Sequence, residues 1–209
     1  MDKVNYYNKI FKEGKDREWD KAPGKTVILN AIKDYNLYEN AVILDIGCAT
    51  GYMLSLIFNT LSKNYKLMLI GIDISEVALN IAKQRYPNIK FIIGDGINLS
   101  FKDSCIDLSI NYGTLEHFDN PEKGIKEIAR VLRQSGLFLH MIPALGHYRK
   151  DRADEGWYGD KTGQPQWNFF RKTWERFFEK SGLQLNPMNN AIKYGAENPG
   201  CFFFGKKIW

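Results

Sequence analysis

Hydrophobic residues between positions 41 and 142 switch repeatedly between two periods. Short apolar, β-branched runs alternate with stretches whose apolar residues recur at helical spacing. Continuous runs of this kind are typical of strands buried on both faces. The runs predict strands at 41–46, 67–72, 89–93, 105–110 and 137–142, and the intervening patterns predict helices at 51–63, 75–86 and from Asn120-Pro121 to Gly136. Ser75 as N-cap and Pro121 at the first helical position mark two helix starts.

Strands that alternate with helices predict right-handed βαβ units and a parallel sheet covered on both faces, hence a three-layer α/β sandwich. We expect one domain over 1–209, with a cofactor-binding core at 41–142. Residues 1–40 end in a helix from 23 to about 35, and residues 169–209 contain a helix at 171–181 and strands at 183–185 and 201–206. The aperiodic segment 144–168 is rich in Gly, Trp and charge, and we interpret it as a substrate lid.

Composition and charge exclude several classes of protein. The 209 residues are 44% hydrophobic, as in a globular chain, and a net charge of +5 with interspersed signs does not favour nucleic acid as a partner. The three cysteines are far apart and predict neither a zinc site nor disulfides. No apolar run approaches the ~20 residues of a membrane span, and the first residues lack a signal-peptide core. We expect a soluble cytoplasmic protein and make no prediction of its oligomeric state.

A glycine-containing loop, Asp45-Ile46-Gly47-Cys48-Ala49-Thr50-Gly51, follows the first predicted strand. Glycines in such a loop let backbone N–H groups approach a ligand closely. The NAD fingerprint GxGxxG is not met, because Ala49 and Tyr52 stand at its second and third glycines. The acid that precedes the loop would repel a pyrophosphate but suits a ligand with an ammonium or sulfonium charge.

Two more acids end the next two predicted strands. Asp73 stands 26 positions after Gly47, where a carboxylate can accept both ribose hydroxyls of an adenosine. Asp95, after the third strand, can accept from an adenine amino group. Because parallel strands end at the same edge of a sheet, we expect these acids and Asp45 to gather around one ligand.

These features resemble the class I S-adenosylmethionine-dependent methyltransferases, from Val42 to about Ile142 and more loosely to Trp209. The family's first motif, hydrophobic-D-x-G-x-G-x-G, is matched with Ala49 in place of the middle glycine. Segments 105–110 and 132–137 resemble its fourth strand and the turn into its fifth. The resemblance implies a Rossmann-like, mostly parallel seven-stranded sheet of order 3-2-1-4-5-7-6, in which the 201–206 strand is antiparallel.

The resemblance also implies a cofactor, S-adenosyl-L-methionine, with S-adenosyl-L-homocysteine as product. It assigns cofactor binding to Asp45, Gly47, Cys48, Ala49, Gly51, Asp73, Ile74, Asp95, Gly96 and Asn111. An N-terminal flap over the methionine end is implied for Tyr6, Tyr7, Arg17 and Trp19; the alternative is that these side chains pack against the first helix.

Candidate catalytic residues follow the fourth strand. His117 is a candidate general base and Glu116 a residue that orients it, although both can instead brace the turn before Pro121. The segment resembles the E-x-x-E-H pattern of ubiquinone-pathway and small-RNA O-methyltransferases, but the first acid falls on Gly113, so we predict no metal site. His140 is expected to be packed and hydrogen-bonded within its strand, and His147 is a lone loop histidine.

The sequence therefore predicts methyl transfer to an oxygen or nitrogen of a small-molecule acceptor, mainly by alignment of the reactants, which supplies effective molarities of about 10⁵–10⁸ M. The N/D-P-P-Y/F signature of amino-methylating enzymes is absent at 111–114, which argues against DNA and glutamine as acceptors. The alternatives are an RNA- or protein-directed methyltransferase of the same fold, a NAD-type oxidoreductase, or a non-catalytic S-adenosylmethionine-binding protein.

Overall fold

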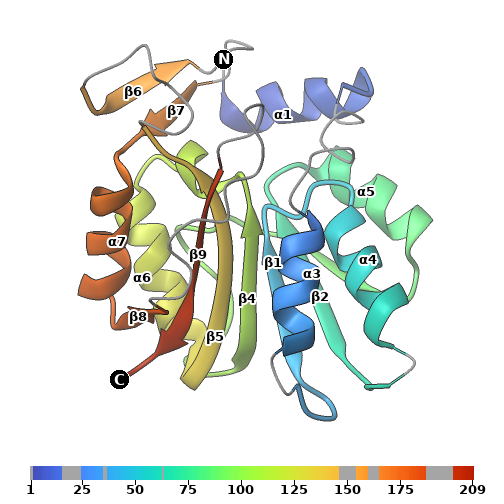
Figure 1. Ribbon diagram of the computed structural model, residues 1–209. Helices are drawn as coiled ribbons and strands as arrows, with labels where there is room; N and C mark the ends of the chain where they lie inside the picture. Colours follow the sequence, from blue (N-terminus) through green and yellow to red (C-terminus); the bar gives the residue numbers. More distant parts are fainter. Residues whose placement is uncertain are drawn as a thin grey trace. The chain divides into compact units, whose positions relative to one another are not determined.

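The computed structural model describes residues 2–15, 25–34, 37–62, 64–145, 154–159, 165–186 and 200–209 (Figure 1). The chain divides into two compact units, Met1–Asp95 and Gly96–Trp209. None of the described helices is long and apolar enough to cross a membrane. Arg17, Trp19 and His147 lie outside the described residues.

The first unit contains three parallel strands with helices between them. Its elements are α1 (Lys3–Lys12), α3 (Lys25–Asp34), β1 (Val42–Ile46), α4 (Tyr52–Leu61), β2 (Met68–Asp73), α5 (Glu76–Arg85) and β3 (Lys90–Ile93). β2 pairs with both other strands, which places Asp45 opposite Gly71 and Asp73 opposite Ile93. The predicted N-cap of α5 is confirmed, because the Ser75 hydroxyl accepts from the Ala78 N–H at 3.2 Å.

The second unit contains the remaining strands of the main sheet and a separate hairpin. Its elements are β4 (Ile106–Tyr112), the 3₁₀ turn η1 (Leu115–His117), α6 (Pro121–Val131), β5 (Leu132–Pro143), β6 (Gly156–Gly159), β7 (Pro165–Asn168), α7 (Arg171–Lys180), β8 (Leu183–Leu185) and β9 (Gly200–Lys207). α6 begins at Pro121 as predicted, and the side-chain oxygen of Asn120 caps it, 2.9 Å from the Lys123 N–H.

The seven-stranded sheet has the order β3-β2-β1-β4-β5-β9-β8. Since β6 and β7 pair only with each other in the described part of the chain, this is the predicted order 3-2-1-4-5-7-6. β9 runs antiparallel to both β5 and β8, whereas β4 and β5 are parallel. The predicted Rossmann-like fold is therefore confirmed.

The prediction that the helix beginning at Asn120-Pro121 extends to Gly136 is wrong. α6 ends at Val131, and β5 begins at Leu132. The guanidinium of Arg133 lies 2.8 Å from the Asp107 carboxylate on β4, and the β4–β5 register shifts at this point. A Cβ at Gly136 would meet the Arg133 carbonyl oxygen at 2.8 Å, so this glycine permits a bulge inside the strand and does not cap the helix.

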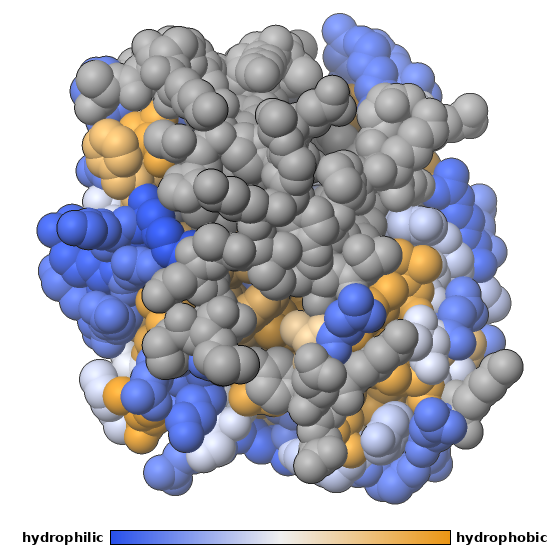
Figure 2. All heavy atoms as spheres, in the orientation of Figure 1, coloured by the Kyte–Doolittle hydropathy of each residue, from blue (hydrophilic) through white to orange (hydrophobic). Residues whose placement is uncertain are grey.

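α7 is amphipathic and covers part of the second unit's core. Its buried side, Trp174 and Phe178, packs inward, and Figure 2 shows a hydrophilic outer surface where α7 lies in Figure 1. The Phe178 ring stacks on Phe138 and Phe203, with centroids 5.1 and 5.2 Å apart. Burial of these rings supplies the main stabilisation of this packing.

His140 lies within this aromatic core, as predicted. It is fully buried, and its Nε2 is 3.1 Å from the Ser109 hydroxyl. Burial lowers the pKa of His140 to about 3, so the imidazole is neutral at physiological pH.

Acid should destabilise the protein through His140. The unfolded chain takes up a proton near pH 6.5 and the folded chain only near pH 3, so this contribution to stability is present above pH 6.5 and is lost as pH falls. We expect a loss of about 1.4 kcal/mol between pH 7.5 and pH 5.5, because each pKa unit corresponds to about that energy. Urea unfolding at both pH values measures it. In His140→Phe the difference between the two pH values should shrink by this amount, and an unchanged difference would contradict the assignment.

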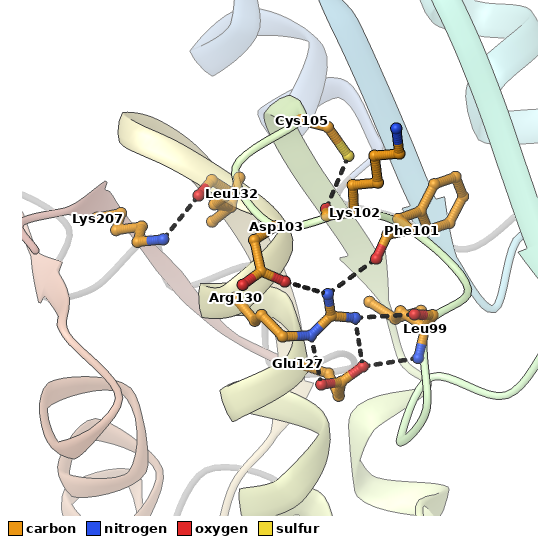
Figure 3. A network of polar contacts seen from close by, with 9 residues as sticks. All are labelled: Leu99, Phe101, Lys102, Asp103, Cys105, Glu127, Arg130, Leu132 and Lys207. Carbon is orange, nitrogen blue, oxygen red and sulfur yellow. Dashed lines mark hydrogen bonds and ion pairs between the residues drawn. The ribbon is translucent and has the colours of Figure 1, made fainter.

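A single arginine on α6 holds the loop before β4 (Figure 3). All five N–H groups of the Arg130 guanidinium donate hydrogen bonds of 2.7–2.8 Å, to the carboxylates of Glu127 and Asp103 and to the Leu99 and Phe101 carbonyls. Glu127 also accepts from the Leu99 N–H at 2.8 Å. These carboxylates raise the pKa of Arg130, and Arg130 lowers the pKa of Glu127. The partners of Arg130 lie on α6 or in the loop before β4, and we interpret the network as structural.

Candidate functional site

The loop between β1 and α4 is tied to the end of β2. The N–H groups of Gly47 and Cys48 both donate to the Ile72 carbonyl at 2.9 Å, and Gly51 N–H donates to the Cys48 carbonyl at 2.9 Å. Gly47, Ala49 and Gly51 all have positive φ, of 73°, 49° and 80°. Three left-handed residues within five positions let the chain turn sharply from strand to helix.

Glycine is required at position 51 by space as well as by φ. A Cβ there would lie 2.6 Å from the Phe91 ring and 3.2 Å from the Tyr86 ring. Cys48 packs in a similar way over Gly71, where an added Cβ would meet its Sγ at 2.7 Å. Burial, with the nearby carboxylates of Asp73 and Asp45, raises the pKa of the Cys48 thiol well above its usual value. Cys48 is therefore a protonated packing residue of the loop.

Asp73, at the end of β2, contacts this loop directly. Its Oδ2 accepts from the Ala49 N–H at 2.9 Å, and its Oδ1 accepts from the Ser75 N–H at 2.8 Å. Burial raises the pKa of the Asp73 carboxyl, although backbone hydrogen bonds from Ser75, Ala49 and Ile74 lower it. The carboxyl group loses hydration on burial, and backbone amides fix its position. A group with its pKa perturbed in this way is typical of a binding site.

The other predicted acids of the first unit lie in different surroundings. Asp45 is 3% exposed inside β1, whereas Asp95 is exposed two residues beyond β3. The Gly94 N–H donates to the Asp73 carbonyl at 3.0 Å, which ties the end of β3 to the end of β2. Ile74 follows Asp73 and is half-buried. The first unit thus brings Asp73, the glycine loop and the end of β3 together.

In the second unit, Asn111 and the η1 turn form one structure. The fully buried Asn111 side chain accepts from the Leu115 N–H at 3.4 Å, and the His117 N–H donates to the Thr114 carbonyl at 2.9 Å. The side chains of Glu116 and His117 are both buried, with Oε1 and Nε2 3.8 Å apart. At 3.8 Å the two groups are in close contact but beyond hydrogen-bond distance. Gly96, the first residue of this unit, is also buried.

A hairpin packs against the η1 turn. The segment 144–168 shows no periodicity, yet the structure pairs β6 with β7 and sets Trp157 opposite Trp167. The Trp167 indole N–H donates to the Phe118 carbonyl at 3.0 Å and its ring stacks on Phe169. Trp157 remains 42% exposed. The hairpin therefore presents an aromatic surface anchored next to Glu116 and His117.

Comparison with known proteins matches the centre of the chain to one family. Residues 44–140 match the family model described as "Methyltransferase domain". The ubiquinone/menaquinone biosynthesis C-methyltransferase UbiE of Campylobacter jejuni is 33% identical over 135 residues, which are 63% of this chain and 55% of the relative. Residues 44–140 of the chain therefore match a methyltransferase domain.

Another protein similar to this chain is also named as a methyltransferase. A probable S-adenosylmethionine-dependent methyltransferase of Mycobacterium tuberculosis is 30% identical over 101 residues, 48% of this chain and 35% of the relative. The matched region thus spans only about half, or less, of these curated relatives. The cofactor of the family is S-adenosylmethionine.

Solved structures agree in fold. A chain in the complex between the Haloferax volcanii Trm112 methyltransferase activator and the putative methyltransferase has a TM-score of 0.73 at 15% identity, covering 97% of this chain and 98% of that chain. An S-adenosylmethionine-dependent methyltransferase from Methanosarcina mazei has a TM-score of 0.66 at 21% identity, covering 85% and 97%.

The first unit also contains contacts that the sequence pattern did not predict. α1 docks on α5 through Asn8, whose Oδ1 accepts from the Ser75 hydroxyl at 2.7 Å. Tyr6 and Tyr7 of the predicted flap lie on α1 with their rings edge to face. Asn8 was not predicted, because a single asparagine on a polar helix carries no pattern. The signals close to it were the N-cap Ser75 and the flap implied for Tyr6 and Tyr7.

Substitutions in the glycine loop should shift stability in opposite directions. Ala49→Gly should stabilise the protein by about 0.5–1 kcal/mol. An L-residue with left-handed φ is strained by about 1–2 kcal/mol, and the greater conformational entropy of glycine in the unfolded chain offsets part of the relief of this strain. Gly51→Ala should destabilise it by about 1–2 kcal/mol, through the same strain and the contact with Phe91. Thermal unfolding followed by circular dichroism measures both. Equal shifts of the same sign would contradict the loop geometry.

Proposed function

We propose that this protein is an S-adenosylmethionine-dependent methyltransferase that methylates a small-molecule acceptor. The observation that supports the proposal most is Asp73. Its carboxylate is held by two backbone amides beside a left-handed glycine loop, within a methyltransferase domain.

The residues of the first unit fit the cofactor. The Asp73 carboxylate accepts hydrogen bonds from the Ala49 and Ser75 amides and a further backbone hydrogen bond from Ile74, which leaves lone-pair capacity for a ribose hydroxyl. Gly47 and Gly51 leave backbone without side chains at the loop, and the negative charge of Asp45 suits a sulfonium. When bound, S-adenosylmethionine supplies an electrophilic methyl carbon, whose bond to sulfur breaks as its bond to the acceptor forms, leaving S-adenosylhomocysteine.

We propose His117 as the base that takes a proton from the acceptor, with Glu116 orienting the imidazole. Both side chains are buried at 3.8 Å separation in the turn that follows β4. The aromatic surface of the β6–β7 hairpin, anchored to the same turn, supports a flat or hydrophobic acceptor.

The name of the Campylobacter jejuni relative supports a small molecule and adds carbon to the oxygen and nitrogen expected as acceptor atoms. Phenols, quinols and small amines are therefore the acceptors to test first. The even mixture of charges along the chain supports small molecules over nucleic acid.

Two measurements test the proposal. Isothermal titration calorimetry should detect S-adenosylhomocysteine binding to the wild type and no binding of NADH. Transfer of a radiolabelled methyl group should then occur to a member of the acceptor panel, and His117→Ala should lower turnover with little change in S-adenosylhomocysteine affinity. Binding without transfer to any acceptor favours a non-catalytic module. Methylation of RNA or protein alone, with steep salt dependence for RNA, favours the macromolecular alternative.

A second candidate is a methyltransferase that acts with a protein activator. It is supported by the Haloferax volcanii structure, a complex with a methyltransferase activator whose matched chain aligns with nearly all of this one. Methyl transfer that appears only when such an activator is added would favour it.

A further inference from the structure

The N-terminal helix reaches the start of α5 through one polar side chain. Asn8 Oδ1 accepts from the Ser75 hydroxyl at 2.7 Å and from the Val77 N–H at 3.5 Å. Phe11, one turn further along α1, is 4% exposed. α1 therefore docks by an apolar side chain and one amide, and that amide satisfies an N–H that α5 itself leaves without a helical partner.

Ser75 connects Asn8 to Asp73. Its N–H donates to Asp73 Oδ1 at 2.8 Å, and its hydroxyl oxygen accepts from the Ala78 N–H at 3.2 Å. A hydroxyl has one proton, and here that proton points to Asn8. Asn8 thus sets the direction of the hydroxyl and contacts the turn that supplies one of the backbone amides holding Asp73.

We propose that Asn8 is a positioning residue for the Asp73 carboxylate and that docking of α1 strengthens cofactor binding through it. The proposal rests on the proposed function, because Asp73 is taken as the ribose-binding group. The coupling is reciprocal, so a bound cofactor also favours the docked helix. The chain of contacts is Asn8 to Ser75, Ser75 to Asp73, and Asp73 to the Ala49 amide of the glycine loop.

A double-mutant cycle tests the proposal on the full chain. S-adenosylhomocysteine affinity is measured by calorimetry for the wild type, Asn8→Ala, Asp73→Ala and the double variant. We expect Asn8→Ala to raise the dissociation constant about 5- to 10-fold in the wild type, and less than 2-fold when Asp73 is already alanine, because residues that act through one another are not additive. Asn8→Asp keeps the acceptor oxygen at this position and should restore most of the affinity.

Asn5 provides a matched control on the same helix. Its side chain is exposed and hydrogen-bonds to Asp2 at 3.5 Å within the described part of α1 and its N-cap, so Asn5→Ala should bind like the wild type. An unchanged affinity in Asn8→Ala overturns the proposal, as does an equal loss with and without Asp73, which would mean that Asn8 acts by another route. Absence of binding by the wild type itself would instead overturn the proposed function.

Discussion

Replacement of Asp73 by alanine is expected to raise the dissociation constant for S-adenosylhomocysteine about 10- to 100-fold. The variant loses a charged hydrogen-bond acceptor, and such bonds contribute about 1.5–3 kcal/mol, where 1.4 kcal/mol is a factor of ten. The Ala49 and Ser75 amides that hold the carboxylate also lose their acceptor. Isothermal titration calorimetry at one salt concentration measures the change.

The loss should appear in binding more than in folding. Burial raises the pKa of Asp73, so its negative charge does not itself stabilise the fold, and Asp73→Asn should melt within a few degrees of the wild type while still binding weakly. Glu76→Gln is the matched control, because it removes the same charge from an exposed position in the first turn of α5. Wild-type affinity in Asp73→Ala, or an equal loss in Glu76→Gln, would contradict the assigned role.

Much of the fold follows from signals that are local in the chain. Continuous apolar runs identify the strands of the sheet, Ser75 caps its helix as predicted, and α6 begins at Pro121 as predicted. The order of the seven strands came from the family resemblance, and the structure confirms it. A buried strand and a capped helix are each determined mainly by their own residues, so sequence patterns reveal them.

Features that depend on distant contacts were not predictable in this way. β5 begins at Leu132 because Arg133 pairs with Asp107 on another strand, a contact that the helical spacing of 121–132 does not reveal. The β6–β7 hairpin depends on rings that meet across strands, such as Trp157 and Trp167. Its strands are four residues long, and the buried side chains of β7 include the amides Gln166 and Asn168, so burial there does not follow hydrophobicity.

The candidate site likewise contains residues that the sequence predicts and one that it does not. The acid at the end of β2 and the glycine loop were predicted, and the structure brings them into contact over 24 positions through the Ala49 amide. The exposed Asp95 and the buried Asp45 remain predicted cofactor ligands. Asn8 was not predicted, because its role depends on a contact with Ser75 across 67 positions.

Removal of the Arg130 side chain should be the most destabilising change considered for the second unit. Arg130→Ala is expected to lower the free energy of unfolding by about 2–4 kcal/mol, because the Glu127 carboxylate and two loop carbonyls lose their donors while partly buried. Arg130→Lys should recover less than half, since an ammonium has three donors and no planar fork to reach five acceptor contacts. Urea unfolding followed by circular dichroism measures both.

Lys126 offers the matched control on the same helix. It pairs with Glu122 at 3.1 Å, but its side chain is 58% exposed, and exposed pairs of this kind contribute at most about 0.5 kcal/mol. Lys126→Ala should therefore be nearly neutral. If Arg130→Ala were equally neutral, the loop before β4 would have to be held by its apolar residues, such as the buried Leu99, and not by the guanidinium. A large loss in Arg130→Ala alone would show that one residue of α6 holds the loop before β4. β4 contains Asn111 and is followed by the η1 turn.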